Sequence, residues 1–127
     1  MPIERLQPSG LTSPPTYSHV VKAGSTLYIS GQVAQDAQGQ VVGRGDILAQ
    51  AAQVFENLGV ALASVGVSYR QLVKTTVFLT DPRFREAYAE VRSRYIRDNF
   101  PASTLLVVAG LASPDYLLEV EAIAVLD

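Results

Sequence analysis

Residues 46–62 have the sequence DILAQAAQVFENLGVAL. The apolar side chains in this stretch recur at spacings of three and four residues, so they fall on one stripe of an α-helix. The stripe consists of Leu48, Ala51, Phe55, Leu58 and Leu62. Asp46 can cap the first turn, and Gly66 is placed where a glycine can end the helix. The sequence therefore predicts an amphipathic helix that buries one face.

Segments on both sides of this helix are rich in β-branched and aromatic residues, which favour strands. We expect strands over residues 17–22, 26–33, 40–42, 72–80, 103–112 and 116–126. Apolar residues at helical spacing predict a second helix over residues 83–97, and its stripe consists of Phe84, Tyr88, Val91 and Tyr95. Residues 1–16 contain several prolines and are expected to form an irregular arm. The order β-β-β-α-β-α-β-β predicts an α+β fold, with both helices on one face of a single sheet.

The length of 127 residues predicts one domain, over residues 1–127. A domain of this size buries about two thirds of the surface that its unfolded chain exposes. The chain has no cysteine, which excludes a disulfide scaffold, a thiol nucleophile and a cysteine-ligated metal. It has one histidine, His19, so a histidine-rich metal site is not expected either.

The charge balance and the hydropathy pattern exclude further classes of protein. Ten basic residues against twelve acidic residues give a net charge of −2, so a strongly basic nucleic-acid binder is not expected. The arginines of residues 83–97 alternate with glutamates, which indicates a solvated helix face, with an RNA-binding patch as the alternative. No apolar run approaches the roughly 18 residues of a membrane span, and residues 1–10 lack the apolar core of a signal peptide. We expect a soluble, cytoplasmic protein with no membrane partner.

Two of the expected strands are apolar on both faces. They contain Leu105–Ala109 and, apart from two glutamates, Leu117–Leu126. Strands of this kind need cover on both faces, and two helices cover only one. The sequence therefore predicts that another copy of the chain covers the second face in a closed oligomer, or else that the sheet curls over its own core.

Glu119 and Glu121 are the strongest candidates for acid–base chemistry. At positions i and i+2 of a strand they project from the same face, which they share with Ile123 and Val125. On a buried face, desolvation and like charge would raise the pKa of one of them, as a general acid or base at neutral pH requires. The alternative is that a glutamate only ties strands together through hydrogen bonds.

The segment Ser30-Gly31-Gln32 interrupts an otherwise β-rich strand. A glycine inside a strand marks either a simple bulge or a close approach of the backbone to a ligand. Tyr17 and His19 alternate onto one face near the start of the chain, where a single histidine is more often packed than catalytic.

Five segments of the chain, taken in order, resemble the RidA/YjgF family of reactive-intermediate deaminases, also labelled L-PSP endoribonucleases. They are Tyr17-Ser18, Ile29–Gln32, Lys74–Leu79, Phe100-Pro101-Ala102 and Glu119–Val125. The resemblance covers nearly the whole chain. It implies a chorismate-mutase-like fold with a mixed sheet, a homotrimer, and small-molecule ligand clefts between neighbouring subunits. It also implies hydrolysis of reactive imines and enamines, such as 2-aminoacrylate, to carbonyl products and ammonia without a cofactor.

The same resemblance assigns roles to individual residues. Tyr17 matches a tyrosine that closes the cleft, and the backbone of Ser30 and Gly31 matches the segment that lies against the ligand. Glu119 matches a glutamate that positions or activates the attacking water. Tyr88 matches a polar residue of the second helix that contributes to substrate binding.

Ser103 departs from the pattern of the deaminating members. They carry an arginine directly after Pro-Ala, where it binds the substrate carboxylate with two hydrogen bonds, whereas Ser103 follows Pro101-Ala102 here. A serine supplies one neutral donor in place of a guanidinium fork. The resemblance therefore implies a subgroup that lacks the clamp and for which deamination of 2-imino acids is doubtful.

Three functions follow from these observations. The first is a cofactor-free hydrolase acting on another imine or enamine, favoured by Glu119. The second is a non-catalytic trimer that binds a small metabolite or acts in regulation, favoured by the absence of arginine at Ser103. The third is an endoribonuclease, which the negative net charge disfavours.

Overall fold

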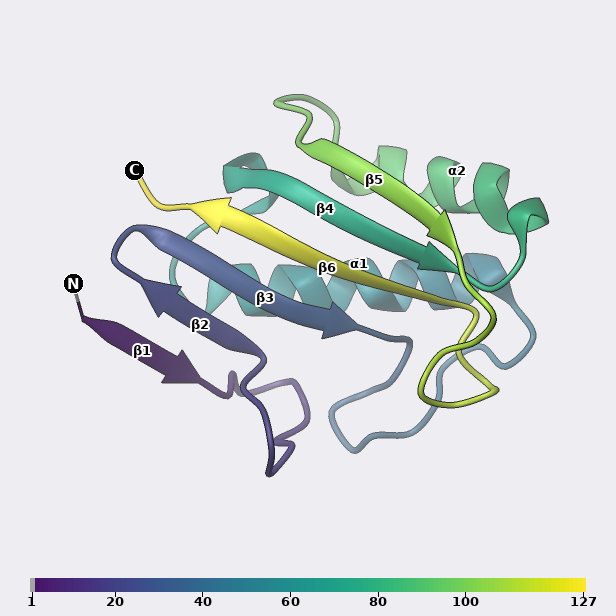
Figure 1. The fold of residues 1–127 in the computed structure, drawn as a ribbon, viewed down its shortest axis with the longest axis horizontal. Coiled ribbons are helices and arrows are strands. Elements are labelled where there is room, and N and C mark those ends of the chain that lie inside the picture. The colour runs from purple at the N-terminus through teal and green to yellow at the C-terminus, as the bar shows by residue number, and fades with distance from the viewer. Residues whose placement is uncertain (1) are drawn as a thin grey trace.

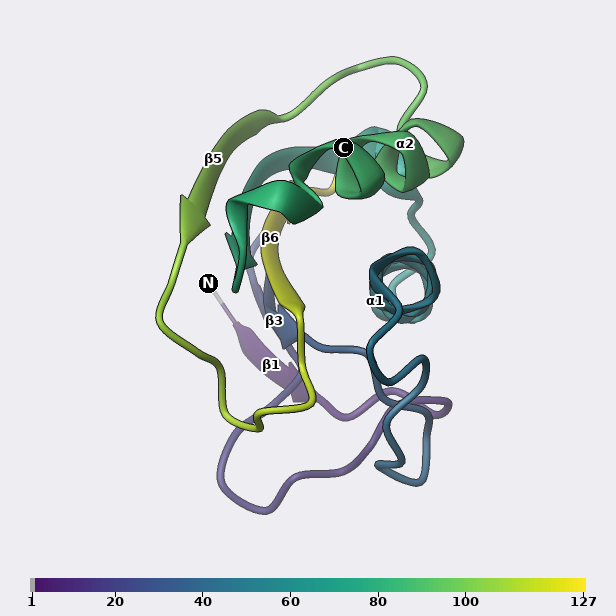
Figure 2. The ribbon, with the colours of Figure 1, turned by 90° about the vertical axis from the view of Figure 1, so that its right-hand side faces the viewer.

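A computed structural model describes residues 2–127 as one six-stranded mixed sheet with two α-helices (Figure 1). The strands are β1 (Ile3–Leu6), β2 (Val20–Ala23), β3 (Thr26–Gln32), β4 (Leu72–Leu79), β5 (Ala102–Val107) and β6 (Leu118–Val125). The helices are α1 (Ile47–Ala63) and α2 (Arg85–Tyr95), and 3-10 turns lie at Tyr69–Gln71 and Pro82–Phe84. Both helices lie on the same side of the sheet (Figure 2). The predicted α+β class is confirmed. The order β-β-β-α-β-α-β-β also agrees, but the first three strands differ from those expected, because β1 was not predicted and residues 40–42 form no strand.

The strands are arranged in the order β1-β2-β3-β6-β4-β5. Strands β4 and β5 run parallel and are connected through α2, while all other neighbouring pairs are antiparallel. The last strand of the chain, β6, therefore lies in the middle of the sheet between β3 and β4. This position brings Glu119 and Glu121 next to residues from distant parts of the sequence.

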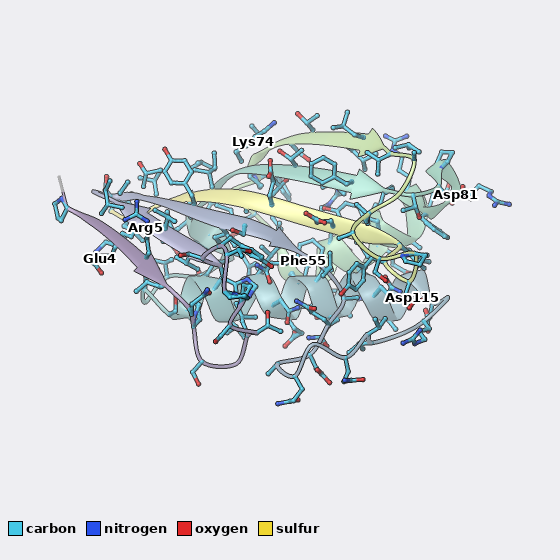
Figure 3. All side chains as sticks on the ribbon, turned by 60° about the horizontal axis from the view of Figure 1, so that its bottom comes forward. Glu4, Arg5, Phe55, Lys74, Asp81 and Asp115 are labelled. Atoms are coloured by element: carbon cyan, nitrogen blue, oxygen red, sulfur yellow. The ribbon has the colours of Figure 1, made fainter. Side chains whose placement is uncertain are left out.

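Helix α1 forms where the apolar stripe predicted it. The Asp46 carboxylate accepts a hydrogen bond from the Ala49 backbone nitrogen at 3.1 Å, as expected of an N-cap. Gly66 follows the helix end with a φ of +78°, a conformation that favours glycine. Four of the five stripe residues are fully buried, and Figure 3 shows one of them, Phe55, between α1 and the sheet. Leu48 is the exception, since it lies in the first turn and is exposed, so the buried stripe begins one turn later.

The N-terminal arm was predicted wrongly. Residues 3–6 are not irregular: they form β1, which pairs with β2 and places Ile3 opposite Ala23. Most side chains of this edge strand are exposed, so its sequence carries no alternation of apolar and polar residues.

The expected strand over residues 40–42 is also wrong. This segment forms only an isolated bridge between Val41 and Gln35. The carboxylate of Asp36 accepts hydrogen bonds from the backbone nitrogens of Gln38 and Gln40, both at 2.9 Å, which closes a tight local loop instead.

Several elements are shorter than predicted. Strand β2 begins at Val20, because the side chain of Gln7 holds the preceding residues in a loop: its amide donates to the Tyr17 carbonyl at 2.6 Å and accepts from the His19 backbone nitrogen at 3.1 Å. Helix α2 begins only at Arg85, after the Asp81-capped 3-10 turn, and ends at Tyr95. Strand β5 ends at Val107, before the loop to β6.

The face of the sheet away from the helices is open in the single chain. In β6 the residues that alternate with the glutamates, namely Leu118, Val120, Ala122 and Ala124, are buried against the helices. Glu119, Glu121, Ile123 and Val125 lie on the other face, which neither helix of residues 2–127 covers (Figure 2). Side chains on this face include Tyr28, 49% exposed, and Leu106, 45% exposed. The alternative interpretation, that the sheet curls over its own second face, is therefore wrong, and cover by another copy of the chain stays a prediction.

Candidate functional site

Four of the predicted site residues line one hollow of about 400 Å³. Tyr17 comes from the loop before β2, Ser30 and Gly31 come from β3, and Glu119 comes from β6. The remaining lining residues are Val33, Gln35, Ala112 and Tyr116. The structure thus brings together segments that are separated by almost the whole length of the chain.

A β-bulge shapes the hollow on the β3 side. The register between β3 and β6 shifts between Ile29 and Gln32, so Gly31 lies at the irregularity, as the interrupted strand pattern predicted. A β-carbon added to Gly31 would overlap the carboxylate Oε2 of Glu119 and lie 2.7 Å from its Cδ. Glycine is needed here because the backbone of β3 contacts the Glu119 side chain directly.

The carboxyl group of Glu119 is perturbed in the direction that acid–base chemistry needs. Glu119 is half-buried, and burial raises its pKa above the usual value of 4.5. The negative charge of Glu121 raises this pKa further. Both glutamates project from the same face, as predicted, but Glu121 is exposed and lines a neighbouring hollow with Lys74 and Thr76. Figure 3 shows Lys74 on this open side of the sheet.

Ser30 is held by three hydrogen bonds that fix the backbone next to Gly31. Its hydroxyl donates to the Ser18 carbonyl at 2.6 Å, and its backbone nitrogen donates to the His19 carbonyl at 2.9 Å. Its own carbonyl accepts from the Gln32 side-chain nitrogen at 3.0 Å. The hydroxyl of Ser30 therefore ties the loop before β2 to β3, and Ser30 lines the hollow from this fixed position.

His19 extends this network and does not line the hollow. It is 1% exposed, with Nδ1 3.0 Å from Gln32 Nε2 and Nε2 2.9 Å from the Thr12 hydroxyl. Gln32 donates to the Ser30 carbonyl through the same nitrogen, so His19 Nδ1 acts as the acceptor and the ring is neutral. Burial lowers the pKa of His19, which favours this neutral form. The burial of His19 agrees with the expectation that this histidine is packed and not catalytic. Its partner Gln32 was not predicted, because no spacing rule connects the two residues.

Tyr88 and Ser103 lie in a separate hollow of about 340 Å³. Its other lining residues are Arg85, Glu86, Ala89, Arg92 and Leu105, from α2 and β5. Tyr88 is 2% exposed and stacks on Phe55 with ring centroids 5.9 Å apart, so it is largely a core residue. Burial raises the pKa of its hydroxyl to about 12, which keeps the phenol protonated. Within one chain the structure does not bring Tyr88 or Ser103 to Glu119.

Residues 2–127 contain neither a group of side chains suited to a metal ion nor a helix suited to a membrane. In this part of the chain, no three histidine, cysteine or acidic side chains are grouped so that they could hold a metal ion. Neither of the two helices described is long and apolar enough to cross a membrane.

Comparison with known proteins establishes the family. The sequence pattern of the family described as Endoribonuclease L-PSP matches residues 9–126. The chain belongs to this family, which is also called RidA/YjgF. The match spans the whole sheet except β1 and includes both helices.

Relatives within the RidA/YjgF family agree in sequence and in structure. A RutC family protein of Pyrococcus horikoshii is 37% identical over 85% of this chain and 85% of its own length. The 2-iminobutanoate/2-iminopropanoate deaminase of Homo sapiens is 36% identical over 86% of this chain and 79% of its own length. The crystal structure of E. coli TdcF with bound serine is 28% identical, covers 97% of this chain and 100% of its own, and superposes with a TM-score of 0.86. This RidA/YjgF chain therefore has imine deaminases among its relatives.

Proposed function

We propose that this chain hydrolyses a reactive imine or enamine to a carbonyl product and ammonia, with Glu119 as the catalytic residue. The observation that carries the proposal is the contact between Glu119 and Gly31: a half-buried carboxyl with a raised pKa is held against glycine backbone in an open hollow. The deaminase activity named for the human relative supports the same reaction class.

The proposed reaction uses water and one carboxyl group. The substrate reacts as the protonated imine. The Glu119 carboxylate removes a proton from a water molecule as its oxygen bonds to the imine carbon, and the π electrons of the C=N bond move to nitrogen, which gives a neutral carbinolamine and the Glu119 carboxylic acid. The acid then protonates the amino group, the C–N bond breaks with its electron pair going to nitrogen, and ammonia leaves. The hydroxyl proton is lost to ammonia or solvent, which gives the C=O product. An enamine becomes the same protonated imine by taking a proton on carbon. The balance is one protonated imine and one water in, one carbonyl compound and one ammonium ion out, with no cofactor.

The other candidate residues are proposed to bind the substrate around this carboxyl group. Tyr17, 48% exposed, lines the hollow on one side, and Ser30 and Gly31 of β3 line it as well. Tyr88 and Ser103 would join the site across a subunit boundary, if the hollow of one chain meets the hollow of the next in a homotrimer. The exposed apolar residues on the open sheet face support such an assembly, because apolar surface of this kind favours contact between subunits.

Ser103 limits the substrates we propose. Replacing a bidentate guanidinium–carboxylate contact by one neutral hydroxyl costs on the order of 2–5 kcal/mol of binding in a desolvated cleft. We therefore propose that 2-imino acids are poorer substrates here than in relatives with arginine at this position. The binding of imines without a carboxylate should be weakened less by the serine.

A second candidate function is a non-catalytic trimer that binds a small metabolite. The bound serine in the TdcF structure favours it, since that relative holds an amino acid in its crystal. Endoribonuclease activity, which the family description names, has less support here. The net charge is −2, and four arginines, Arg44, Arg70, Arg83 and Arg94, are within ion-pair distance of acidic side chains.

A coupled assay tests the proposal. An oxidase acting on an amino acid or a neutral amine generates the imine in solution, and ammonia release is followed with and without the chain. The human deaminase serves as the positive control for 2-imino acids. Acceleration of at least one imine above its spontaneous hydrolysis would support the hydrolase. No acceleration of any imine in the panel would overturn it and favour the metabolite-binding trimer.

A further inference from the structure

The hollow around Glu119 contains a second hydrogen-bonding side chain, Tyr116, which the proposed reaction does not use. Tyr116 lies in the loop before β6 and lines the hollow of about 400 Å³ together with Gln35 and Glu119. Its hydroxyl donates a hydrogen bond to the side-chain oxygen of Gln35 at 3.2 Å. A tyrosine hydroxyl has one hydrogen, so this bond leaves the oxygen of Tyr116 as an acceptor for a ligand in the hollow.

The direction of the bond from Tyr116 to Gln35 follows from a network that begins at His19. His19 Nδ1 accepts from Gln32, so the ring hydrogen is on Nε2, which donates to the Thr12 hydroxyl oxygen at 2.9 Å. The side-chain nitrogen of Gln35 donates to the same Thr12 oxygen at 3.4 Å. The amide oxygen of Gln35 is therefore the atom next to Tyr116, and the tyrosine hydroxyl has to be the donor.

Two buried amide side chains of α1 hold the backbone of both residues in place. The side-chain nitrogen of Gln50 donates to the Asp115 carbonyl at 2.8 Å, and its oxygen accepts from the backbone nitrogen that follows Tyr116 at 2.9 Å. Asn57 donates to the Gln35 carbonyl at 3.0 Å. Both amides are almost fully buried. A binding group held this firmly loses little freedom when a ligand arrives.

The charge of the hollow favours a cation. Among the described residues that line it, Glu119 is the one charged side chain. Burial raises the pKa of Tyr116, and the acidic groups of Tyr17, Asp115 and Glu119 raise it further, so its phenol stays protonated at neutral pH. The hollow thus presents two acceptors, the Tyr116 oxygen and the Glu119 carboxylate. A cation with N–H donors complements both, whereas the charge of Glu119 repels an anion.

We propose that Tyr116 is a specificity residue of this hollow. Its oxygen, oriented by Gln35, accepts a hydrogen bond from an N–H of the ligand and selects a planar nitrogen cation over a neutral or anionic molecule of the same shape. The catalytic meaning of this selection rests on the proposed function, because a protonated imine is such a cation. In that reaction Tyr116 holds the nitrogen while Glu119 activates the water. Binding of a stable cation needs no turnover and can be measured separately.

The test is a titration of the full chain with acetamidinium, a stable planar cation with N–H donors, followed by the backbone amide NMR shifts of Gly31, Tyr116 and Glu119. Acetamide and acetate are the ligand controls, since they have nearly the same shape but carry no charge and a negative charge, respectively. Acetamidinium should bind roughly tenfold or more tightly than acetamide, because hydrogen bonds from a charged donor are the stronger ones. Acetate should bind most weakly.

Variants separate the role of Tyr116 from a general effect of charge. Tyr116→Phe removes the acceptor and should weaken acetamidinium binding by roughly fivefold or more, and raise the KM for a hydrolysed imine by a similar factor. Tyr28→Phe removes a hydroxyl from β3 outside the hollow and should change neither. Gln35→Leu frees the Tyr116 hydrogen to turn toward the ligand. This variant should bind acetamidinium more weakly and acetamide more tightly, a change of preference that a merely structural role of Gln35 would not produce.

Several results would overturn the proposal. They are absence of acetamidinium binding, equal affinity for acetamidinium and acetamide in wild type, and tighter binding of acetate, which would assign the hollow to anions. Equal acetamidinium affinity in wild type and folded Tyr116→Phe would also overturn it. If Tyr116→Phe does not fold, an unchanged ligand preference in Gln35→Leu has the same meaning.

The two proposals for this hollow can fail separately. Imine hydrolysis with a wild-type KM in Tyr116→Phe would contradict the role of Tyr116 and leave that of Glu119 intact. Acetamidinium binding that depends on Tyr116, in a chain that hydrolyses no imine, would support the specificity site and overturn the proposed hydrolase.

Discussion

The α-carbon of Gly31 lies so close to the carboxylate of Glu119 that a β-carbon at residue 31 would occupy the space of Oε2. The two residues are on neighbouring strands, at the point where β3 bulges against β6. Because residue 31 has no side chain, the carboxyl group of Glu119 can remain in the hollow shared with Tyr17 and Ser30.

Gly31→Ala should therefore displace the Glu119 side chain. The overlapping atoms are the flexible end of the glutamate, so the fold should survive at a cost of about 1 kcal/mol, near the low end for overpacking. Misplacing a catalytic group by about 1 Å reduces rates by roughly a hundredfold. We expect a loss of that size in imine hydrolysis, with an unchanged circular dichroism spectrum.

Gly110→Ala is the matched control for this substitution. A β-carbon at Gly110 would meet nothing within 4 Å among the described residues, so activity and stability should both stay near wild type. Full activity in Gly31→Ala would show that the contact with Glu119 does not position the carboxyl group.

The pH profile should report the raised pKa of Glu119. The proposed general base must be deprotonated, so the rate should rise with pH as Glu119 ionises, at a pH above the 4.5 of an ordinary carboxyl. Glu121→Gln removes the like charge that raises this pKa, so the acidic limb of the profile should move to lower pH. If the acidic limb of the pH–rate profile lies at the same pH in Glu121→Gln and in wild type, this result would contradict electrostatic coupling between the carboxyl groups of Glu119 and Glu121.

Ser103→Arg should increase the turnover of 2-imino acids. The substitution places a guanidinium fork at the start of β5, where the wild type has a single hydroxyl, and we expect at least a tenfold rise in kcat/KM. Ser103→Lys adds the charge without the fork and should give a smaller gain. The assay is ammonia release from imines formed by an amino-acid oxidase, and equal rates in wild type and Ser103→Arg would show that residue 103 does not contact the carboxylate.

The chain should assemble as a trimer through its open sheet face. Sedimentation equilibrium should give about three times the chain mass of 13.7 kDa. Leu106 is 45% exposed on that face, so Leu106→Glu should weaken the assembly by burying a charge without a partner. A wild-type chain that remains monomeric at micromolar concentration would contradict both the assembly and a cleft shared between subunits.

Much of the fold follows from local patterns in the sequence. The spacing from Ala51 to Leu62 predicted α1 because those residues face a core, and the i, i+2 spacing placed Glu119 and Glu121 on one face of β6. A bulge was one of the two interpretations that the sequence left open for Gly31, because a glycine inside a strand marks either a bulge or a close backbone approach. Each of these inferences depends on neighbours within a few residues.

What the sequence did not predict depends on contacts between distant segments. Strand β1 has exposed side chains on both faces, so its pairing with β2 leaves no periodic pattern. The hydrogen bonds from Gln32 to His19 and Ser30 become visible only when the loop before β2 is folded onto β3. Arg92 lies beside Ser103 because α2 packs near β5, and residues 92 and 103 have no local relation in the chain.

The most direct test of the account is the imine hydrolysis rate of Glu119→Gln at neutral pH, with Glu121→Gln as the matched control on the same strand and face. Glutamine has nearly the shape of glutamate and keeps its hydrogen-bonding capacity, so the fold and the assembly should be preserved. Loss of the general base should lower kcat by roughly a hundredfold or more, whereas Glu121→Gln should stay near the wild-type rate. A folded Glu119→Gln chain that hydrolyses the imine at the wild-type rate would contradict the catalytic role of Glu119. It would show that the Glu119 side chain has only a structural role.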